Sequence, residues 1–559
     1  MIPLPPLPEP LPELRLGPSV KGELMLIGGQ KLRSSWSWQG STPGRPQQLW
    51  LPLDLLESQL GFRRSEGKLE WFGRRRPLAD IPQITLGDEV GLEVAEWLWT
   101  TGVNLRRNGT VLELTLPGAR LQKLRRGKGK TADRLVLDLD APLLVQRLGD
   151  DLHLGLHLNR AQRHTLARLG LRPQLHRHGV VLQGQATRLK TLSLAQPWRL
   201  VLDGVKPGTS ATARPQTLHS PAIAAWLRRG LVLERRRLKV GVKPLELVRA
   251  GGDLPAIGLG LRPLTMAKSQ TGLQFLPQLA QPAGAVVAVN GGFFNRIVQV
   301  PLGALRLNNR WLSGPILNRG VIAWSNSRKL HFGRLRLQQT LWSNSGGRHR
   351  IDQLNSGYVQ RGLSRYTRDW GPVYRPLSGQ EEALLIRDGV VKNLLNNDLL
   401  KRGVVLPDKA DLLVARGGAT LPAKPGDRVR ISSGSRSGLD QPQNVLGGGP
   451  LLLKNGRIVL NGRAEGFSPD FLALAAPRTV VGQGRGGTWL LTLRGIGGSE
   501  SGAGPTLLET ALAAKQLGLR DALNLDGGSS TTVVAGGRTV MTGRGGTPRI
   551  HNGIGLVPL

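Results

Sequence analysis

A carboxylate followed by two glycines and a run of four hydroxyls stands near the C-terminus, at Asp526 to Thr532 (DGGSSTT). The apolar run 522–525 before it predicts a short buried strand that ends at Asp526. Glycines let backbone N–H groups approach a ligand, and such donors with hydroxyls suit the oxygens of a phosphate or a sugar. The segment predicts a pocket for an anionic ligand, lined by Gly527, Gly528, Ser529 and Ser530.

A second segment of the same kind lies far upstream. The apolar run 286–289 leads into Asn290, the glycine pair 291–292 and two phenylalanines. Either segment alone also fits a tight turn after a core strand. Together they predict one pocket, in which Asn290 is a candidate catalytic residue.

The composition indicates a multidomain protein of the α+β class. A chain of 559 residues is too long for one core. Its 75 glycines and 38 prolines favour turns and short strands over long helices. We expect small β-rich N-terminal domains, then an α+β catalytic domain with a mixed or antiparallel sheet core.

Charge and cysteine content limit the classes of function. The chain has no cysteine, which excludes disulfides, thiol catalysis and thiolate metal sites. Its net charge of +38 would attract polyanions such as nucleic acid or phosphorylated glycans, but an arginine-rich solvated surface is the simpler interpretation. No zinc-finger, helix-turn-helix or RNA-binding motif is present, so a nucleic-acid partner is not expected.

The N-terminal part divides into a proline-rich lead-in (1–20) and a small domain (21–117). Residues 1–16 lack a basic start and an apolar core, so they do not resemble a signal peptide. Within 21–117 a strand, a helix and a hairpin occur twice: helix 55–60 capped by Asp54 with a hairpin at Gly67, then helix 90–101 with a hairpin at Asn108-Gly109. This unit resembles the stalk-like domain at the N-terminus of copper amine oxidases, which implies a spacer or interaction role.

Residues 118–205 contain one pentapeptide twice, Arg-Leu-Val-Leu-Asp at 134–138 and at 199–203. This segment resembles the AMIN-type β-sandwich of envelope enzymes, although any small antiparallel domain fits as well. The resemblance implies binding to peptidoglycan or the cell wall. Histidines 153, 157, 164, 176 and 178 lack metal-ligand spacing on one element, so we interpret them as surface or core residues.

After a linker-like segment (206–217), six motifs in residues 218–559 resemble the phosphodiester glycosidase family. They are 289–294 with 301–303, 365–371, 447–456, 476–482, 521–532 and 552–555. Two glycines follow Asp526 where many members have three, and 547–552 differs from the usual approach to the last motif. These departures concern substrate preference.

The resemblance implies a hydrolase that cleaves the bond between a sugar anomeric carbon and a phosphate oxygen. Arg478 would pair with the phosphodiester, Gly448, Gly449, Gly527 and Gly528 would admit backbone donors, and Asn552 would hold sugar hydroxyls. Each of these residues also has a plain structural interpretation, as an ion pair, a turn or a strand-end cap.

The acting carboxylate stays open at the level of sequence. Asp526 is the first candidate, as nucleophile, base or ion ligand. Glu500 lies in a glycine-rich loop before a helix predicted over 505–517, whose N-terminus would favour an anion. Glu509 on that helix faces either the site or solvent. We expect no cofactor, although Asp526 could ligate a divalent cation.

Three functions therefore compete: an envelope-associated glycosidase acting on phosphorylated glycan, a non-catalytic envelope protein that binds phosphorylated glycan or peptidoglycan, and a polyanion-binding protein. The first is the hypothesis that the motifs favour. It places the protein in the periplasm or cell envelope, without a membrane span.

Overall fold

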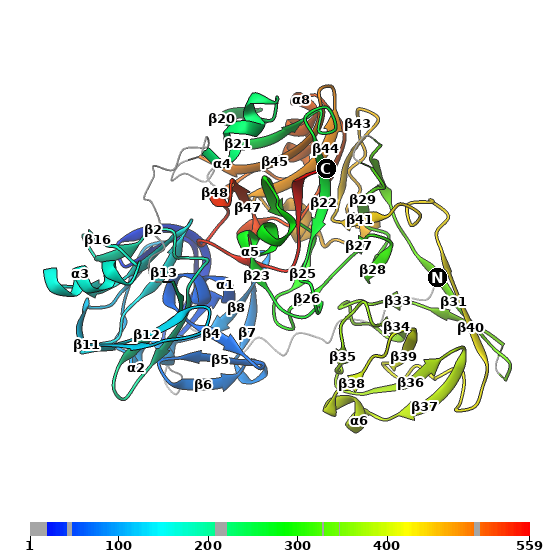
Figure 1. The fold of residues 1–559 in the computed structure, drawn as a ribbon, viewed down its shortest axis with the longest axis horizontal. Helices are drawn as coiled ribbons and strands as arrows, with labels where there is room; N and C mark the ends of the chain where they lie inside the picture. The colour runs from blue at the N-terminus through cyan, green and yellow to red at the C-terminus, as the bar shows by residue number, and fades with distance from the viewer. Residues whose placement is uncertain (1–18, 42–46, 207–220, 327–328, 346, 497–502) are drawn as a thin grey trace. The chain divides into compact units, whose positions relative to one another are not determined.

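The computed structural model describes residues 19–41, 47–206, 221–326, 329–345, 347–496 and 503–559. Two compact units contain them: a first of 1–146, 153–182 and 189–209, and a second of 147–152, 183–188 and 210–559. Both consist mostly of strands (Figure 1). Glu500, most of the lead-in and nearly all of the linker-like segment lie outside the described residues. The division into a stalk-like domain (21–117) and an AMIN-like domain (118–205) remains a prediction.

Residues 19–205 form three larger sheets and a hairpin-like ribbon. The seven-stranded sheet has the order β7 (Gln83–Leu86), β8 (Glu89–Glu93), β3 (Gln48–Pro52), β2 (Gln30–Gln39), β1 (Ser19–Ile27), β10 (Val111–Thr115), β9 (Asn104–Asn108). The five-stranded sheet has the order β15 (Leu156–His157), β11 (Ala119–Gly127), β12 (Asp133–Leu139), β19 (Arg199–Val205), β18 (Lys190–Leu194). The four-stranded sheet is β13 (Val145–Leu148), β14 (Asp151–Leu154), β17 (Gly179–Leu182), β16 (Pro173–His176), and the ribbon is β4 (Arg63–Ser65), β5 (Lys68–Trp71), β6 (Arg74–Pro77).

Helices are few and short among the described residues of this part. They are α1 (Leu53–Leu55), which continues as a π-helix over Leu56–Leu60, a 3-10 turn over Leu78–Asp80, α2 (Ala95–Thr100) and α3 (Arg160–Arg168). The helix ends at Gly61, which has φ +82° and accepts a left-handed conformation without a steric penalty. Its N-cap is Pro52, so the prediction that Asp54 caps it is wrong.

The predicted hairpins at Gly67 and Asn108-Gly109 are confirmed, whereas the helix predicted over 90–101 is only partly correct. Its first half is strand β8, paired with β7 on one side and β3 on the other. The Glu93 carboxylate then accepts from the backbone N–H of Ala95 at 2.9 Å, where α2 begins. Two flanking strands therefore outweigh the helical pattern of the sequence.

The repeated pentapeptide pairs with itself. Strands β12 and β19 are antiparallel neighbours, with Arg134 opposite Asp203 and Asp138 opposite Arg199. Each arginine thus faces an aspartate of the other copy, and Arg134 forms an ion pair with Asp203. Leucines 135, 137, 200 and 202 of both copies are buried.

The second unit is built on three antiparallel sheets. The first is seven-stranded: β20 (Val232–Val240), β21 (Lys243–Gly252), β45 (Gly487–Gly495), β44 (Arg478–Gly484), β46 (Leu519–Asn524), β42 (Leu451–Lys454), β43 (Arg457–Ile458). The second is five-stranded: β22 (Leu259–Leu264), β50 (Gly553–Pro558), β24 (Val287–Asn290), β47 (Thr532–Ala535), β48 (Arg538–Thr542). The third is β28 (Arg310–Ser313), β27 (Leu305–Leu307), β41 (Asn444–Gly447), β29 (Gly320–Trp324), β30 (His331–Arg334).

One buried cluster joins these three sheets. It contains Val481 and Leu523 from the seven-stranded sheet, Val289 from the second sheet and Ile322 from the third. Helix α8 (Leu507–Gln516) packs on the other face of the seven-stranded sheet. Helix α5 (Leu276–Ala280) packs on the second sheet, the one that contains β24 and β47 (Figure 1). The predicted α+β fold with an antiparallel core is confirmed, as is the helix predicted over 505–517.

The remaining short elements complete the second unit. They are the helices α4 (Pro221–Arg228), α6 (Asn397–Arg402) and α7 (Pro469–Ala473), the 3-10 turns at Gln281–Ala283, Arg463–Glu465 and Gly528–Ser530, and the strand pairs β23 (Gln274–Phe275) with β49 (Arg549–Ile550), β25 (Phe294–Asn295) with β26 (Val300–Pro301), and β35 (Val373–Tyr374) with β38 (Val404–Val405).

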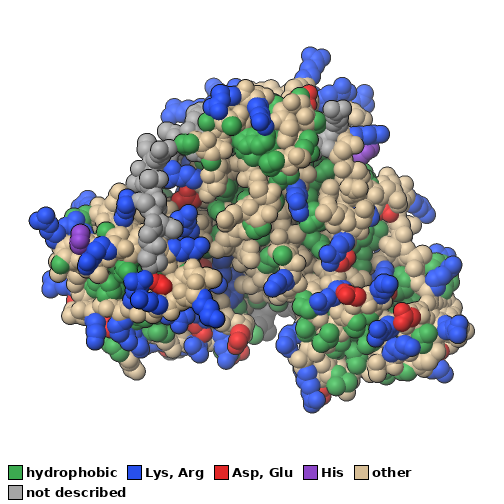
Figure 2. Space-filling view, in the orientation of Figure 1, with side chains coloured by type: hydrophobic (Ala, Val, Ile, Leu, Met, Phe, Trp, Pro, Cys, Tyr) green, Lys and Arg blue, Asp and Glu red, His purple; other side chains and the backbone are tan. Residues whose placement is uncertain are grey.

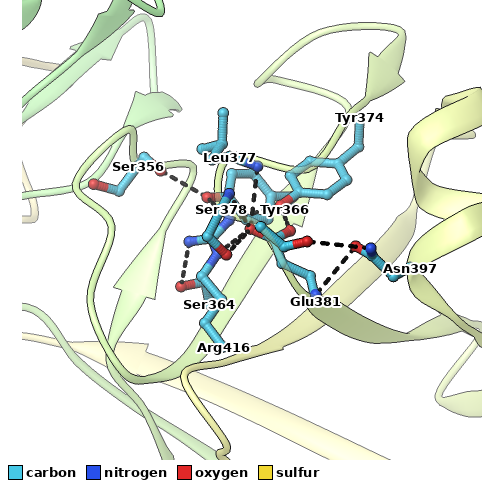
Figure 3. A network of polar contacts seen from close by, with 10 residues as sticks. Ser356, Ser364, Tyr366, Tyr374, Leu377, Ser378, Glu381, Asn397 and Arg416 are labelled. Atoms are coloured by element: carbon cyan, nitrogen blue, oxygen red, sulfur yellow. Dashed lines mark hydrogen bonds and ion pairs between the residues drawn. The ribbon is translucent and has the colours of Figure 1, made fainter. Parts of the chain in front are cut away.

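Between β30 and β41 the chain leaves the third sheet and forms two further sheets. One is β33 (Gln353–Leu354), β34 (Gly362–Thr367), β39 (Ala410–Arg416), β36 (Glu381–Arg387), β37 (Val390–Leu395), and the other is β32 (Gly347–Ile351), β31 (Gln338–Ser343), β40 (Val429–Gly434). A buried ion pair, Arg416 Nε to Glu381 Oε1 at 2.7 Å, lies inside the first, and the Arg416 guanidinium also donates to the hydroxyls of Tyr366, Tyr374 and Ser364 (Figure 3).

Lysine and arginine side chains are scattered over the visible face instead of forming one patch (Figure 2). This distribution fits the interpretation of the net charge as a solvated surface. Among the described residues, no helix is both long and apolar enough to cross a membrane.

Candidate functional site

Asp526 stands where β46 leaves the core. Leu525 is fully buried, whereas Asp526 is half-buried, and the residues that follow it are buried again. One carboxylate oxygen accepts from the N–H of Gly527 at 3.0 Å. The backbone N–H of Asp526 donates to the carbonyl of Gly291 at 2.9 Å. The two glycine-containing segments predicted to share a pocket therefore lie in direct contact.

The Asn290 side chain links these two segments by hydrogen bonds. Its side chain is 1% exposed; Nδ2 donates to the carbonyl of Asp526 at 2.7 Å, and Oδ1 accepts from Thr479 Oγ1 at 2.7 Å and from the N–H of Thr532 at 3.1 Å. The amide thus ties β24 to β44, to the turn after β46 and to β47. This geometry gives Asn290 a positioning role at Asp526, and its predicted catalytic role remains untested.

The glycine pair 448–449 lies beside the end of β46. Gly449 donates to the carbonyl of Asn524 at 2.7 Å, and Gly448 donates to the carbonyl of Gly320 at 2.9 Å. A Cβ on Gly448 would lie 2.3 Å from Asn524 O, which no side chain allows. Close packing of two backbones therefore accounts for this glycine, while the predicted role of both as phosphate donors remains a prediction.

Arg478 opens β44 and is 1% exposed. Its Nε donates to the carbonyl of Pro505 at 3.3 Å, and Nη2 donates to the carbonyl of Leu474. A Cβ on Gly527 would lie 3.6 Å from Arg478 Cδ, which places the guanidinium arm beside the turn after Asp526. As folded, Arg478 links that turn to the start of α8, and pairing with a phosphodiester remains a prediction.

The hydroxyl run after Asp526 is turned into the protein. Ser529, Ser530, Thr531 and Thr532 are at most 2% exposed. Ser530 Oγ accepts from Arg296 Nη2 at 2.6 Å, and the N–H of Gly528 donates to the carbonyl of Pro477 at 2.9 Å. Asp526 is consequently the member of this run whose side chain solvent or a ligand reaches most readily.

Asn552 completes the cluster. Its Oδ1 accepts from the N–H of Gly292 at 2.7 Å, so its Nδ2 faces His551 Nδ1 at 3.3 Å. The His551 proton therefore resides on Nε2, which lies 2.9 Å from the carbonyl of Gln270. Burial lowers the pKa of His551 to about 4, so the ring is neutral and holds Asn552 in this orientation.

Of the two other candidate carboxylates, Glu500 and Glu509, the structure describes only Glu509. Glu500 lies outside the described residues. Glu509 forms a reciprocal cap with Thr506 at the start of α8 and an ion pair with Lys243 at 2.8 Å. Burial raises the pKa of Glu509, but hydrogen bonds from Lys243 and from the Thr506 backbone outweigh burial and hold the pKa below its usual value. Glu509 is thus a capping residue, and the helix N-terminus already has an anionic partner.

Sequence reasoning missed an aromatic and basic cluster next to these motifs. The rings of Phe467 and Phe471 stack at 4.9 Å, and Phe293 lies 5.5 Å and 5.9 Å from them. The Arg319 guanidinium lies 4.1 Å above Phe467, and that of Arg478 lies 5.6 Å from Phe471. Phe293 belongs to a quoted motif, but the other members lie outside the motifs or were given another role.

A buried carboxylate, Glu465, forms hydrogen bonds next to this cluster. It is fully buried and accepts from Arg334 Nε at 2.8 Å and from the N–H groups of Gly320 at 2.8 Å and Leu451 at 3.1 Å. Three donors thus satisfy this buried carboxylate, so Glu465 has a structural role. Nothing in its sequence neighbourhood distinguishes it from a surface glutamate.

In the first unit, four histidines expected to be scattered line one pocket of about 240 Å³: His153, His157, His176 and His178. Ring centroids lie 5.7 Å apart for 153 and 176 and 6.1 Å apart for 176 and 178. No group of three or more histidine, aspartate or glutamate side chains within the described ranges is arranged to hold a metal ion. Folding therefore gathers residues from different elements whose spacing in sequence carried no signal.

Comparison with known proteins agrees with the motifs. Residues 380–557 match the model of the phosphodiester glycosidase family, which confirms the predicted resemblance for this part of the chain and indicates, in general terms, a phosphodiester glycosidase and hence a hydrolase. No curated protein matches the sequence.

Three solved structures are similar to the chain. A hypothetical protein from Synechocystis is 29% identical over 96% of this chain and 99% of its own, with a TM-score of 0.56. A putative exported protein from Burkholderia pseudomallei is 16% identical over 79% and 98%, with a TM-score of 0.44. The zebrafish N-acetylglucosamine-1-phosphodiester α-N-acetylglucosaminidase catalytic domain is 14% identical over 59% and 82%, with a TM-score of 0.28.

Proposed function

We propose that this protein hydrolyses the glycosidic C–O bond of sugar-1-phosphate diesters on envelope or exopolysaccharide glycans. The observation that carries the proposal is the convergence of the motif segments on one half-buried carboxylate. Asn290 and Gly291, at the end of β24, and Gly449, after β41, contact the backbone of segment 524–526 from two other segments of the chain. Such over-determined placement of one accessible carboxylate among buried partners is typical of an active site.

Asp526 is the proposed catalytic carboxylate. When the C–O bond breaks, its electron pair leaves with the phosphate oxygen, and positive character develops on the sugar. A phosphate leaving group departs readily, so stabilising the sugar cation and the phosphate anion matters more than protonating the leaving group. A carboxylate beside the anomeric carbon supplies that stabilisation, either as a nucleophile or as the base that deprotonates water.

Asn290 and Arg478 support this carboxylate in the proposal. Asn290 fixes the carbonyl of Asp526, and Arg478 holds the turn that follows. The Asn290 amide is occupied by two backbone groups and the Thr479 hydroxyl, and the Arg478 guanidinium donates to two backbone carbonyls. The expected effect of either residue is therefore on the position of Asp526 and of the adjoining turn.

The bond that breaks is identified by running the reaction in ¹⁸O-labelled water with a panel of sugar-1-phosphate methyl diesters. The proposal expects ¹⁸O on the free sugar and unlabelled methyl phosphate as the other product. Label on phosphate, with sugar-1-phosphate as the product, would instead mean P–O cleavage and a phosphodiesterase. The anomer formed first, read by NMR, separates a nucleophilic Asp526 (retention) from a basic one (inversion).

The upstream domains are proposed to act as binding modules for cell-wall or phosphorylated glycan, with the protein in the periplasm or cell envelope. Residues 21–205 contain no pair of carboxylates predicted to act together. The repeated envelope-type resemblances of 21–117 and 118–205 support a spacer and binding role. Retention on isolated cell-wall material, compared with and without these domains, tests this part of the proposal.

A further inference from the structure

Arg319 is a guanidinium with few protein partners. Its Nε lies 3.3 Å from the carbonyl of Glu465. The Glu465 carboxylate itself is occupied by Arg334 and two backbone donors, and among the described residues no acidic side chain forms an ion pair with Arg319. Burial lowers the pKa of Arg319 to about 10, with smaller opposing effects of Tyr358 and Glu465. The group is thus a partly desolvated cation at neutral pH.

Two aromatic rings lie close to this cation. Its Cζ lies 4.1 Å from the centroid of Phe467 and 5.4 Å from that of Phe293. Stacking on rings holds a guanidinium without using its N–H donors, because the attraction is to the ring face. The donors of Arg319 that do not face Glu465 are therefore available to an external acceptor.

The backbone around Arg319 is also constrained. Leu317 and Asn318 have φ of +52° and +54°, and the N–H of Arg319 closes the turn on the carbonyl of Ile316 at 3.0 Å. A left-handed conformation is costly for a branched residue such as leucine. The turn places Arg319 at the start of β29, directly before Gly320, which contacts the glycine pair at 448–449.

A continuous set of contacts leads from Arg319 to the proposed catalytic carboxylate. Phe293 follows Gly292 in the segment that bonds Asp526 through Gly291. On the other side, Phe471 lies under Arg478, whose arm lies against Gly527. Arg319, the three phenylalanines and Asp526 therefore border the same region of the second unit.

We propose that Arg319 is the residue that binds the phosphate of the substrate, and that Phe293 forms the apolar wall beside the sugar. The identity of the ligand as a phosphodiester rests on the proposed function. When the C–O bond breaks, the guanidinium donates to the oxygens that receive the electron pair. Arg478, which carries the phosphate in the motif-based hypothesis, instead positions the backbone.

The test uses the full chain with Arg319→Met and Arg319→Lys. Charge-assisted hydrogen bonds to phosphate are worth roughly a tenfold to hundredfold change in affinity. We expect Arg319→Met to weaken binding of phenyl phosphate by that factor in calorimetry, and to lower kcat/KM for a sugar-1-phosphate methyl diester by at least as much. Arg319→Lys retains the charge without the planar fork and should fall between Met and wild type.

Arg430→Met is the matched control. Arg430 is on β40, in the sheets formed between β30 and β41, and its guanidinium also lies over an aromatic ring, 4.8 Å from the centroid of Trp342. It should bind phenyl phosphate as the wild type does. If wild type binds phenyl phosphate and Arg319→Met does not, the subsite stands even where no diester is cleaved, and only the proposed function fails. Equal binding by wild type and Arg319→Met, or no binding by wild type, overturns the subsite. Should Arg319→Met not fold, Arg319→Lys decides by the same measurement.

Discussion

Asp526 differs from its neighbours in being reachable, and this difference predicts the effect of one substitution. Asp526→Asn keeps an acceptor for the N–H of Gly527 and loses the charge. We expect turnover of a sugar-1-phosphate diester to fall by roughly 10²- to 10⁴-fold, with a nearly unchanged melting temperature. Steady-state kinetics and thermal unfolding of the same preparations measure both.

Asp470→Asn is the control for this prediction, since it removes an exposed carboxylate from α7. It should leave turnover and unfolding unchanged. A purely turn-capping role for Asp526 predicts the opposite pattern, in which Asp526→Asn lowers the melting temperature while activity persists.

His551 predicts a pH dependence of stability. Its pKa is lowered from 6.5 to about 4 in the folded protein, because burial disfavours the charged ring. Between these values the unfolded chain binds the proton and the folded chain does not, so stability falls as pH decreases from about 6.5 to about 4. The difference corresponds to about 3 kcal/mol of unfolding free energy.

Urea unfolding at pH 7, 6, 5 and 4 measures this loss for wild type and for His551→Gln. Glutamine retains a donor for the carbonyl of Gln270 and does not titrate. The unfolding free energy of the variant should therefore fall less steeply as the pH decreases, and the difference in slope should correspond to at most one proton. Parallel curves for the two proteins would mean that other groups cause the acid sensitivity.

The sequence identified candidate residues that the structure brings together, but it did not show the contacts that each side chain makes. The order of motifs identified Asn290, Arg478, Asp526 and Asn552, and the structure brings them together. The sequence could not show that these side chains are buried, because an asparagine that links several segments by hydrogen bonds and one that binds sugar can have the same neighbours in sequence. Arg319 was missed for the converse reason: its partners Phe293 and Phe467 lie far from it along the chain.

Among the sheets, the buried pair of Arg416 and Glu381 predicts a large loss of stability on substitution. Both side chains are at most 2% exposed, and Glu381 also accepts from Ser378 and Tyr374 (Figure 3). Arg416→Met leaves a buried carboxylate without its cation, which costs about 3–5 kcal/mol of unfolding free energy. Chemical denaturation measures the change.

Arg365→Met is the matched comparison, because Arg365 pairs with Asp411 on the same sheet at 2.7 Å with both side chains partly exposed. Solvent screening limits that pair to about 1 kcal/mol or less. Similar losses for the two variants would contradict the assignment of Arg416 to a desolvated network.

Local sequence signals predicted hairpin turns better than the cap at Asp54 or the boundary between strand and helix. Gly67 and the pair Asn108-Gly109 specify their hairpins through backbone conformations that few other residues adopt. Residues 90–101 contain apolar positions that fit a helix, yet β8 occupies the first half since strands on both sides satisfy its backbone. One of these strands, β7, directly precedes β8, but the other, β3, lies about 40 residues upstream and leaves no local trace.

Across the full chain, the proposed division of labour predicts the effect of removing residues 1–217. The truncated protein should still hydrolyse a small soluble diester, since the proposed site lies within 290–552. It should bind isolated cell-wall material less tightly than the full chain does. Turnover and a sedimentation assay with cell-wall fragments measure the two properties.

The same truncation should also lower the melting temperature. The second unit includes residues 147–152 and 183–188, and Asp150 there accepts from the N–H of Thr539 at 3.0 Å. Gln278 likewise donates to the carbonyl of Thr187 at 3.0 Å. Full-length Asp150→Ala should reproduce part of the loss in stability and none of the loss in cell-wall binding. A folded truncated protein without turnover would mean that upstream residues contribute to the site.

The self-pairing pentapeptide of β12 and β19 has a consequence for how chains meet one another. Read antiparallel to its own copy, Arg-Leu-Val-Leu-Asp places opposite charges at both ends and leucine beside leucine. Any second molecule carries the same two copies in the same sense, so β12 of one chain can accept β19 of another with identical contacts. Strand exchange between molecules can then compete with correct folding at high concentration, and the segment 140–198 between the two strands, which contains the four-stranded sheet and α3, decides which chain supplies the partner.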